Sequence, residues 1–451
     1  MPTVAPGPNG GLFGMRSVKQ FLRNPLEFLA GLGHTYGDLT RLRLGPNTVF
    51  LVNHPDLIRD VLVTKARSFR KEARTLRILG QVDGKGLVLT EGDFWLRQRR
   101  LMQPAFHMRR MERYTETIVS KVEKLAGRWR ALPAGSQLPV VDEMTHLTLE
   151  IIAKLFFDVE LTGNAAQLGE AVHVLSDVFK NEASSFFTLP DWLPLQSKRR
   201  KKWALQALDT FIWDVIRTRR IAGTDQGDLL SMLLLAVDEE GDGQRMTDQQ
   251  VRDEAITMFN AGHDSTAAAL AWIWWLIAEH PEIETALRAE AQAVLGHRSA
   301  TFADVPRLVL ADQVVREALR LYPPVWLMFT RETVENVELG GFEIPKGAWI
   351  YISPWVTQRD PRFFPDPLKF DPARFAPGNK DGVSPYAWIP FGGGPHICIG
   401  MTLAITEMVL IVSTLIREFR LRMPPNLPAV VPEPLLAIRP LGGLPMELER
   451  L

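Results

Sequence analysis

A long helical run near the middle of the chain constrains its fold more than any other feature. The run begins after Thr247 and continues to about Glu279, with helix-forming and apolar residues along most of its length. At a rise of about 1.5 Å per residue, such a helix is on the order of 50 Å long. We therefore expect it to cross a whole domain.

The remaining patterns predict a mainly helical protein with a minor sheet. Alternating residues at 40–44 and 48–52 flank the turn signal Gly45-Pro46-Asn47 and predict a β-hairpin. Residues 1–20 should be irregular, and residues 65–92 should form a long loop with short helical pieces, because glycines interrupt any helical period there. Further helices are expected at 24–36, at 55–64, from residue 93 onward, over most of 108–179, in a segment that ends at about residue 220, and at 309–322. The 451 residues contain no linker and no repeat, so one large domain is expected.

Composition excludes several classes of protein. Lys+Arg and Asp+Glu both number 52, so no net charge draws the chain to nucleic acid. A single cysteine rules out an intramolecular disulfide framework and fits a reducing cytoplasm. The longest apolar run, Ala267–Ala278, is too short for an integral membrane anchor, and no targeting segment is present. The basic run at 198–202 is most simply a solvated helix face, with a gate or a membrane-surface contact as the alternative.

The middle of the long helix breaks the local rules of helix formation. Gly262 costs roughly 1 kcal/mol relative to alanine, and Asp264 and Ser265 belong to residue types that prefer caps and turns. Ala261 and Gly262 would leave a groove almost free of side chains, in which a flat ligand can lie. Asp264 and Ser265 would then supply the acid and the hydroxyl of a proton relay. The alternative is a kink with a solvated polar face.

The only cysteine, Cys398, follows a glycine-rich segment that begins at Phe391 and precedes an apolar, helix-forming run to Ile416. The start of a helix carries a positive partial charge and unpaired N–H groups, which favour thiolate over thiol. Glycines also let a large flat group approach the backbone closely. The alternative is a buried structural cysteine, a common environment for this residue.

Two weaker patterns gain meaning beside these. Glu317 and Arg320 lie three residues apart and can pair on one helix face. With Arg374 they suggest a buried network that holds an irregular segment, although a surface ion pair is the simpler alternative. Trp95 and Arg99 share a helix face, which is usually packing alone.

Taken together, these motifs resemble the cytochrome P-450 family of haem-thiolate monooxygenases. The family's cysteine pattern, F-x-x-G-x-[R/H]-x-C-x-G, is complete from Phe391 to Gly400. Its [A/G]-G-x-[D/E]-T-T segment matches residues 261–266 except at Ser265. The family's E-x-x-R and P-x-R-F elements match residues 317–320 and 372–375.

The resemblance implies the cytochrome P-450 fold, mainly α, as a single haem domain over residues 1–451. Residues 1–70 and 325–390 would contribute a small β-rich lobe. Residues 93–322 and 398–420 would form the helical lobe.

Carried over position by position, the resemblance implies a haem b cofactor with Cys398 as the axial ligand of its iron. Further cofactor contacts would come from His396, Trp95, Arg99, Arg331, Phe391, Ala261 and Gly262. Protons would pass through Asp264, Ser265 and Thr266. A structural triad would consist of Glu317, Arg320 and Arg374.

Two positions depart from the family pattern. Ser265 stands where threonine is usual, so a hydroxyl is kept but the stiffness of a β-branched side chain is lost, and Thr266 could share its role. His396 replaces the commoner arginine. Because histidine can lose its charge near neutral pH, anchoring of the cofactor should be sensitive to pH.

The implied function is insertion of one oxygen atom of O2 into a hydrophobic substrate such as a fatty acid, terpenoid or steroid. Electrons would come from a separate ferredoxin or flavodoxin with its reductase, docking on a basic face that includes Arg97, Arg100, Arg109 and Arg110. The enzyme would be a cytoplasmic monomer. The expected substrate pocket comprises Phe187, Met258, Phe259, Val325, Trp326, Leu327, Met328 and Leu444. The alternatives are a peroxide-driven peroxygenase, a non-catalytic haem-thiolate sensor, and a haem-free helical binding protein.

Overall fold

The computed structural model describes residues 4–161, 165–184, 190–193, 195–223, 225–238, 241, 243–378 and 383–451. The chain forms two compact units, each built from two stretches of sequence. Unit 1 contains residues 1–77 and 316–398, and unit 2 contains residues 78–315 and 399–451. As the family resemblance implied, helices dominate and the sheets are small.

Unit 1 is organised around a five-stranded sheet with the order β1-β2-β8-β5-β3. The predicted hairpin is confirmed, because β1 and β2 pair antiparallel from Leu39↔Val52 to Leu44↔Asn47. Strand β8 continues the sheet in parallel with β2, and β5 joins it to β3 in antiparallel fashion. The strands span Leu39–Leu44 (β1), Asn47–Val52 (β2), Phe69–Lys71 (β3), Arg331–Thr333 (β5) and Trp349–Ile352 (β8).

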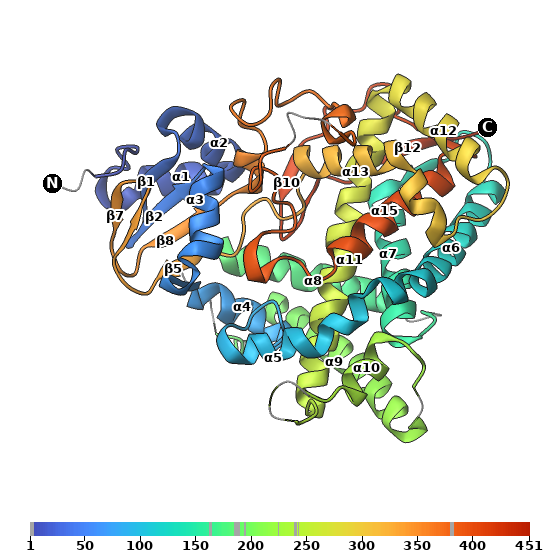
Figure 1. Ribbon diagram of the computed structural model, residues 1–451, viewed down its shortest axis with the longest axis horizontal. Coiled ribbons are helices and arrows are strands. Elements are labelled where there is room, and N and C mark those ends of the chain that lie inside the picture. Colours follow the sequence, from blue (N-terminus) through green and yellow to red (C-terminus); the bar gives the residue numbers. More distant parts are fainter. Residues whose placement is uncertain are drawn as a thin grey trace. The chain divides into compact units, whose positions relative to one another are not determined.

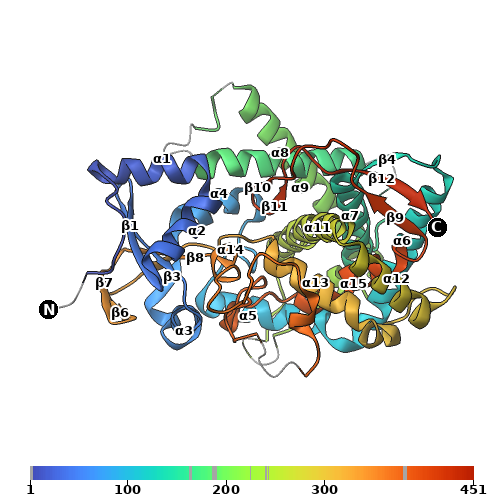
Figure 2. The same cartoon turned by 90° about the horizontal axis from the view of Figure 1, so that it is seen from above.

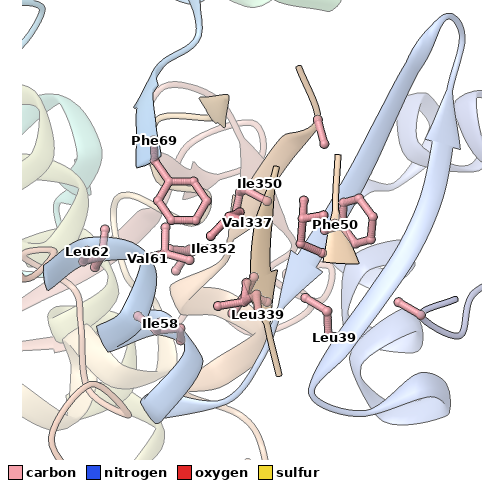
Figure 3. Packing of buried hydrophobic residues seen from close by; sticks show 14 of the residues in the cluster. Leu39, Phe50, Ile58, Val61, Leu62, Phe69, Val337, Leu339, Ile350 and Ile352 are labelled. Atoms are coloured by element: carbon pink, nitrogen blue, oxygen red, sulfur yellow. The ribbon is translucent and has the colours of Figure 1, made fainter. Parts of the chain in front are cut away.

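Alternation along these strands supplies the core of unit 1 (Figure 3). Phe50 and Val52 of β2 and Ile350 of β8 share one face of the sheet, as a period of two requires. This face packs on α3 (Pro55–Arg59) and the π-helical turn Asp60–Thr64 that follows it, through Ile58, Val61 and Leu62. The hairpin of β6 (Val337–Leu339) and β7 (Phe342–Ile344) completes this cluster.

The opposite face of the same sheet packs on the N-terminal helices. Val49 and Leu51 of β2 contact Leu29 and Leu32 of α2 (Pro25–Tyr36) in a second apolar cluster. The prediction that residues 1–20 are irregular holds for residues 4–11 but was wrong from residue 12 on, because Leu12–Gly14 form a 3-10 turn and Met15–Arg23 form helix α1. Its apolar positions are few, and it is helical because Val18 and Phe21 pack into this cluster. A short helix, α14 (Pro354–Thr357), also contacts α2.

Unit 2 is a set of helices packed around α11 (Figure 1). Its helices are α5 (Gly92–Met102), α6 (Met108–Ala131), α7 (Val140–Phe157), α8 (Ala165–Ser184), α9 (Gln196–Ala222), α10 (Leu229–Leu235), α11 (Asp248–Glu279), α12 (Pro281–Leu295) and α15 (Met401–Leu415). Helices α4 (Ala73–Asp83) and α13 (Val309–Leu321) each begin in one unit and end in the other.

The long helix α11 has the predicted extent and no break within it. Thr247 caps it through a capping box with Gln250, in which each side chain accepts a hydrogen bond from the other residue's backbone N–H. The kink proposed as an alternative reading is therefore absent from this fully described helix. Figure 2 looks nearly along α11, and α7 lies beside it, as the contacts between the two helices also show.

Gly262 allows this close packing of α7 on α11. A Cβ atom added at Gly262 would lie 2.7 Å from Cδ1 of Ile152 on α7. The glycine at position 262 is therefore explained by helix packing as well as by the groove predicted from the sequence.

Two small sheets complete unit 2. β4 (Gln137–Pro139), β12 (Pro445–Arg450) and β9 (Phe419–Arg422) form one, and β10 (Pro432–Pro434) pairs with β11 (Ile438–Pro440) in the other. Strand β11 contacts α11, and Nε1 of Trp272 on α11 donates a hydrogen bond to the carbonyl of Ile438. None of the helices over the described ranges is both long and apolar enough to cross a membrane.

The prediction of a loop at residues 65–92 was only partly right. Helix α4 occupies Ala73–Asp83, with Gly80 inside it. The glycines that follow serve tertiary contacts, since a Cβ at Gly84 would collide with the Asp253 carboxylate and one at Gly86 with the Thr257 hydroxyl. The backbone N–H of Lys85 donates to Asp253 Oδ2 at 2.9 Å. The turn after α4 is thereby fixed to α11.

Candidate functional site

The cysteine loop of unit 1 is held in a single compact conformation. The backbone N–H of Cys398 donates to the carbonyl of Phe391 at 2.9 Å, which closes the loop. Gly394 has φ +67°, and a Cβ there would lie 2.5 Å from the carbonyl oxygen of Leu62. Glycine is therefore required by both conformation and space. Cys398 itself is exposed on its unit, unlike the buried structural cysteine of the alternative reading.

A buried network of charged side chains supports this loop. The Arg320 guanidinium and the Glu317 carboxylate are fully buried and joined by two hydrogen bonds of 2.7 and 2.8 Å. Arg374 Nε lies 3.4 Å from Oε1 of Glu317, an oxygen that also accepts from Arg320. The structure thus brings together the three residues of the predicted triad.

Gln358 connects the network to the loop. Its amide group donates to the carbonyls of Leu319 and Arg320 at 3.0 and 2.9 Å, and its Oε1 accepts from the backbone N–H of Ile389 at 2.8 Å. Ile389 lies two residues before Phe391, at the start of the cysteine loop. The position of the loop is therefore coupled to the buried ion pair.

In unit 2, the centre of α11 is less covered than the buried stretches on either side of it. Residues 251–259 and 266–274 are buried, whereas Asn260, Gly262 and Ser265 are half-buried and Ala261 is exposed. Ser265 Oγ donates to the carbonyl of Ala261 at 2.9 Å. Thr266 donates in the same way to Gly262 at 3.0 Å but is buried. Ser265 is thus the more accessible of the two hydroxyls.

Asp264 is buried and forms an ion pair with Arg439 of β11. The cost of placing this carboxylate in the interior is offset by a guanidinium that is itself mostly buried. Burial also lowers the pKa of Arg439. The sequence pattern indicated that Asp264 needs a partner but did not identify it.

The neighbouring histidine has a structural role. His263 is buried, and its Nδ1 is 2.6 Å from the carbonyl of Phe259. Burial lowers the pKa of His263 to about 4. It is therefore neutral near pH 7 and can donate one fixed hydrogen bond within the helix.

The remaining predicted cofactor contacts lie on both units. In unit 2, the guanidinium of Arg99 stacks over the ring of Trp95 on α5, 5.7 Å from its centroid. In unit 1, Arg331 begins β5, and His396 ends the short 3-10 turn before Cys398. Each side chain is held by its own secondary-structure element, and their roles stay predictions.

Two predicted pocket residues are buried in unit 2. Phe259 is fully buried among Phe157, Phe211 and His263, with ring centroids 5.4 to 6.1 Å away. Leu444, which directly precedes β12, is also buried. Their role in a substrate pocket stays a prediction.

The other residues predicted to line the pocket lie in different environments, and their role in a pocket stays a prediction. Met258 is buried on α11, and Trp326 and Leu327 pack against an apolar cluster of unit 1. Val325 is exposed, and the Cε of Met328 lies 3.4 Å from the Cβ position of Gly392 in the cysteine loop. Phe187 lies outside the described residues.

Two residues of the predicted basic docking face, Arg97 and Arg100, make contacts within unit 2. Arg100 forms two hydrogen bonds with Asp238 at 2.6 and 2.8 Å. Arg97 lies 3.6 Å from the same carboxylate and donates to the carbonyls of Gln244 and Arg245. The sequence could not separate these internal pairs from a free cationic surface.

Sequence reasoning missed a polar pair near the acid. Asn260 on α11 donates from Nδ2 to Asp83 Oδ1 at 2.7 Å. Burial raises the pKa of Asp83 to about 6. Asn260 was recognisable as a polar residue in a largely apolar helix, but Asp83 was hidden in the predicted loop.

Each unit offers a feature that fits a flat, sulfur-held cofactor. Unit 1 presents an exposed thiol at the end of a glycine loop, and α11 of unit 2 presents an exposed alanine between buried stretches. Across the described ranges, no group of three or more His, Cys, Asp or Glu side chains is placed to hold a bare metal ion.

Comparison with known proteins gives consistent results. The family model described as cytochrome P-450 matches residues 6–443. The chain is 38% identical over 426 residues to cyclooctatin synthase of Streptomyces melanosporofaciens, covering 94% of this chain and 91% of that protein. It is 37% identical to cyclooctat-9-en-7-ol 5-monooxygenase of the same organism, covering 90% and 86%. It is 34% identical to pentalenene oxygenase of Streptomyces avermitilis, covering 90% and 89%.

Proposed function

The chain belongs to the cytochrome P-450 family and is an oxidoreductase of the monooxygenase type, and we propose that its substrate is a terpenoid. The observation that carries the reaction class is the glycine loop that presents the exposed Cys398. The substrate class is supported by the three bacterial relatives, whose names refer to terpenoid compounds. The largely apolar surroundings of the α11 centre favour the same class of substrate.

Cys398 would hold the iron of haem b through its thiolate. Trp95, Arg99, Arg331 and His396 would contact the propionate groups, because cationic and N–H donors suit carboxylates. When bound, haem supplies the activation of dioxygen and the transfer of one oxygen atom to the substrate. The protein supplies the ligand, the orientation of the substrate and the protons.

The residues of α11 would deliver those protons. Asp264 is the only carboxylic acid in the central segment 260–266, and Arg439 fixes its position. Ser265 is accessible, and its oxygen can still accept a hydrogen bond while its O–H donates to Ala261. Because the carboxylate paired with Arg439 is ionised, Asp264 would first take up a proton from solvent and then pass it to Ser265 or to an intervening water. Electrons would come from a separate ferredoxin or flavodoxin with its reductase.

The ligand assignment is tested by Cys398→Ser, with Ile399→Ala as a control in the same loop. The wild type and the control should give the red-shifted carbon monoxide spectrum of a thiolate haem after reduction. Cys398→Ser should lose this spectrum even where it retains haem. A thiolate spectrum in Cys398→Ser would refute the assignment.

The proton path is tested by the ratio of product formed to NADPH consumed. Asp264→Asn should lower the turnover rate by roughly 10- to 100-fold, and more of the reducing equivalents should appear as peroxide. Turnover driven by added hydrogen peroxide should be much less affected. Equal coupling in Asp264→Asn and wild type would remove Asp264 from the path.

A further inference from the structure

A small cavity in unit 2 adjoins Asp264. Its volume is about 70 Å³, and it lies among the end of α4, helices α8, α9 and α11, and the β10–β11 turn. Ile78, Leu175 and Leu436 are among its apolar walls. Its polar lining consists of Gln81, Asp83, Glu182, Lys201, Asn260 and Asp264. Asn260 and Asp264 lie four residues apart on α11 and therefore face the same side of the helix.

Asn260 and Asp83 form a polar pair with hydrogen-bonding capacity to spare. The 2.7 Å bond from Asn260 Nδ2 to Asp83 Oδ1 uses one of two amide hydrogens. Over the part of the chain that is described, Asn260 Oδ1 and Asp83 Oδ2 accept no hydrogen bond. Both side chains are half-buried, so the unused acceptors are open to a ligand that completes their hydrogen bonds.

The pair is not needed to hold α4 against α11. The segment after α4 is already fixed there by two other carboxylates of α11. The N–H of Lys85 donates to Asp253 at 2.9 Å, and the N–H of Leu87 donates to Glu254 at 2.9 Å. A purely structural role for the Asn260–Asp83 pair would therefore be redundant.

The cavity is large enough for a polar substituent. Roughly 10–15 Å³ of such space already holds one water molecule, so about 70 Å³ accommodates one oxygen substituent and the carbon that bears it.

We propose that Asn260 and Asp83 bind a hydroxyl group on the substrate, so that this enzyme oxidises a terpenoid that already carries an oxygen atom. The inference rests on the proposed function and names the substrate class more closely. The substrate O–H would donate to Asn260 Oδ1 or Asp83 Oδ2, and its oxygen would accept the second amide hydrogen of Asn260. An earlier reaction that introduces an alcohol, either an oxygenation or a cyclisation ended by water, must then supply the substrate.

The test compares alcohols with their parent hydrocarbons. Borneol with bornane, cedrol with cedrane, and sclareol with labdane are titrated into the haem-loaded enzyme, and the spin-state shift and heat of binding are measured. At least one alcohol should bind 10-fold or more tightly than its hydrocarbon, because a site built for a hydroxyl rejects an analogue that lacks it, by roughly 10-fold or more. Absence of such a preference in all three pairs would overturn the proposal.

The variants separate hydroxyl recognition from general binding. Asn260→Leu, which keeps the side-chain size, should weaken alcohol binding by about 10-fold or more and leave hydrocarbon binding unchanged. Asp83→Asn should weaken alcohol binding less than Asn260→Leu does. It provides a second test of the site in case Asn260→Leu fails to fold. Ile78→Val, a cavity-wall control, should affect both members of a pair alike. Equal losses for alcohol and hydrocarbon in Asn260→Leu would contradict the proposal.

The proposal can fail while the proposed function stands. In that case the wild type gives the thiolate spectrum but shows no preference for the alcohols. If the thiolate spectrum itself is absent, the proposed function fails, and the heats of binding still report whether alcohols are preferred.

Discussion

Replacing Arg320 by methionine should strongly destabilise unit 1. Arg320 is fully buried and donates to both oxygens of Glu317. It also donates to the carbonyls of Gln358, Pro367 and Lys369 at 2.8, 2.7 and 3.1 Å. Methionine fills much of the volume but provides no donor.

The size of the effect follows from what remains buried. Removing one partner of a buried ion pair costs about 3–5 kcal/mol, since the other charge is left uncompensated. The three carbonyls would add about 1–3 kcal/mol each if they stayed dry, but the exposed Lys369 shows that water can reach part of this segment. We therefore expect Arg320→Met to lower the free energy of unfolding by about 4 kcal/mol.

The assay is urea unfolding followed by tryptophan fluorescence, with Arg316→Met as the matched control. Arg316 lies on the same helix, half-buried, with its guanidinium 5.6 Å from the ring of Trp388. Its replacement should cost under about 1 kcal/mol. Because Gln358 links the network to Ile389, Arg320→Met should also lower the haem content of the purified protein.

A double-mutant cycle with Glu317→Gln identifies the cause. The double variant should be less destabilised than the sum of the single variants by about 2 kcal/mol or more, since no buried charge is left unpaired. Strict additivity, or a cost for Arg320→Met no larger than for Arg316→Met, would refute the reasoning.

Three further predictions concern unit 2. Gly262→Ala should destabilise it by about 1–3 kcal/mol through a clash with Cδ1 of Ile152, and Ile152→Val should recover part of the loss in thermal unfolding; no recovery would place the strain elsewhere. Burial raises the pKa of Glu407 from 4.5 to about 8, so its contribution to stability is complete below about pH 4.5 and is lost as the pH rises through 8. Glu407→Gln should thus gain stability relative to the wild type between pH 5 and pH 9, by roughly 1–3 kcal/mol in urea titrations, and an unchanged difference across this range would contradict the assignment. Thr247→Ala removes the capping-box acceptor for Gln250 and should cost about 1 kcal/mol, whereas Thr247→Ser, which keeps the hydroxyl, should cost little.

Features that depend on neighbouring residues could be predicted from the sequence. Helix α11 begins one residue after its predicted cap and ends at the predicted residue, because capping and periodicity are local properties. The β1–β2 hairpin follows from its turn residues in the same way. The cysteine loop was recognisable because a complete spacing pattern is also local.

Features that depend on tertiary contacts could not be predicted from the sequence. Helix α1 was missed because its stability comes from packing on the sheet of unit 1. Helix α4 was missed because Gly80, Gly84 and Gly86 resemble helix breakers, whereas the last two are required by contacts with Asp253 and Thr257. A glycine pattern alone does not distinguish a flexible loop from a tightly packed turn.

The α11 site combines both kinds of information. A buried acid at position 264 indicated that a cation must lie nearby, and Arg439 is the only basic residue between Arg422 and Arg450. Yet the pairing spans 175 residues and depends on β11 packing against α11. A charged residue alone in an apolar stretch is thus a sign of a distant partner, and the fold then shows which of the possible partners it meets. The same reasoning applies to Asn260, whose partner Asp83 leaves part of its hydrogen-bonding capacity unused.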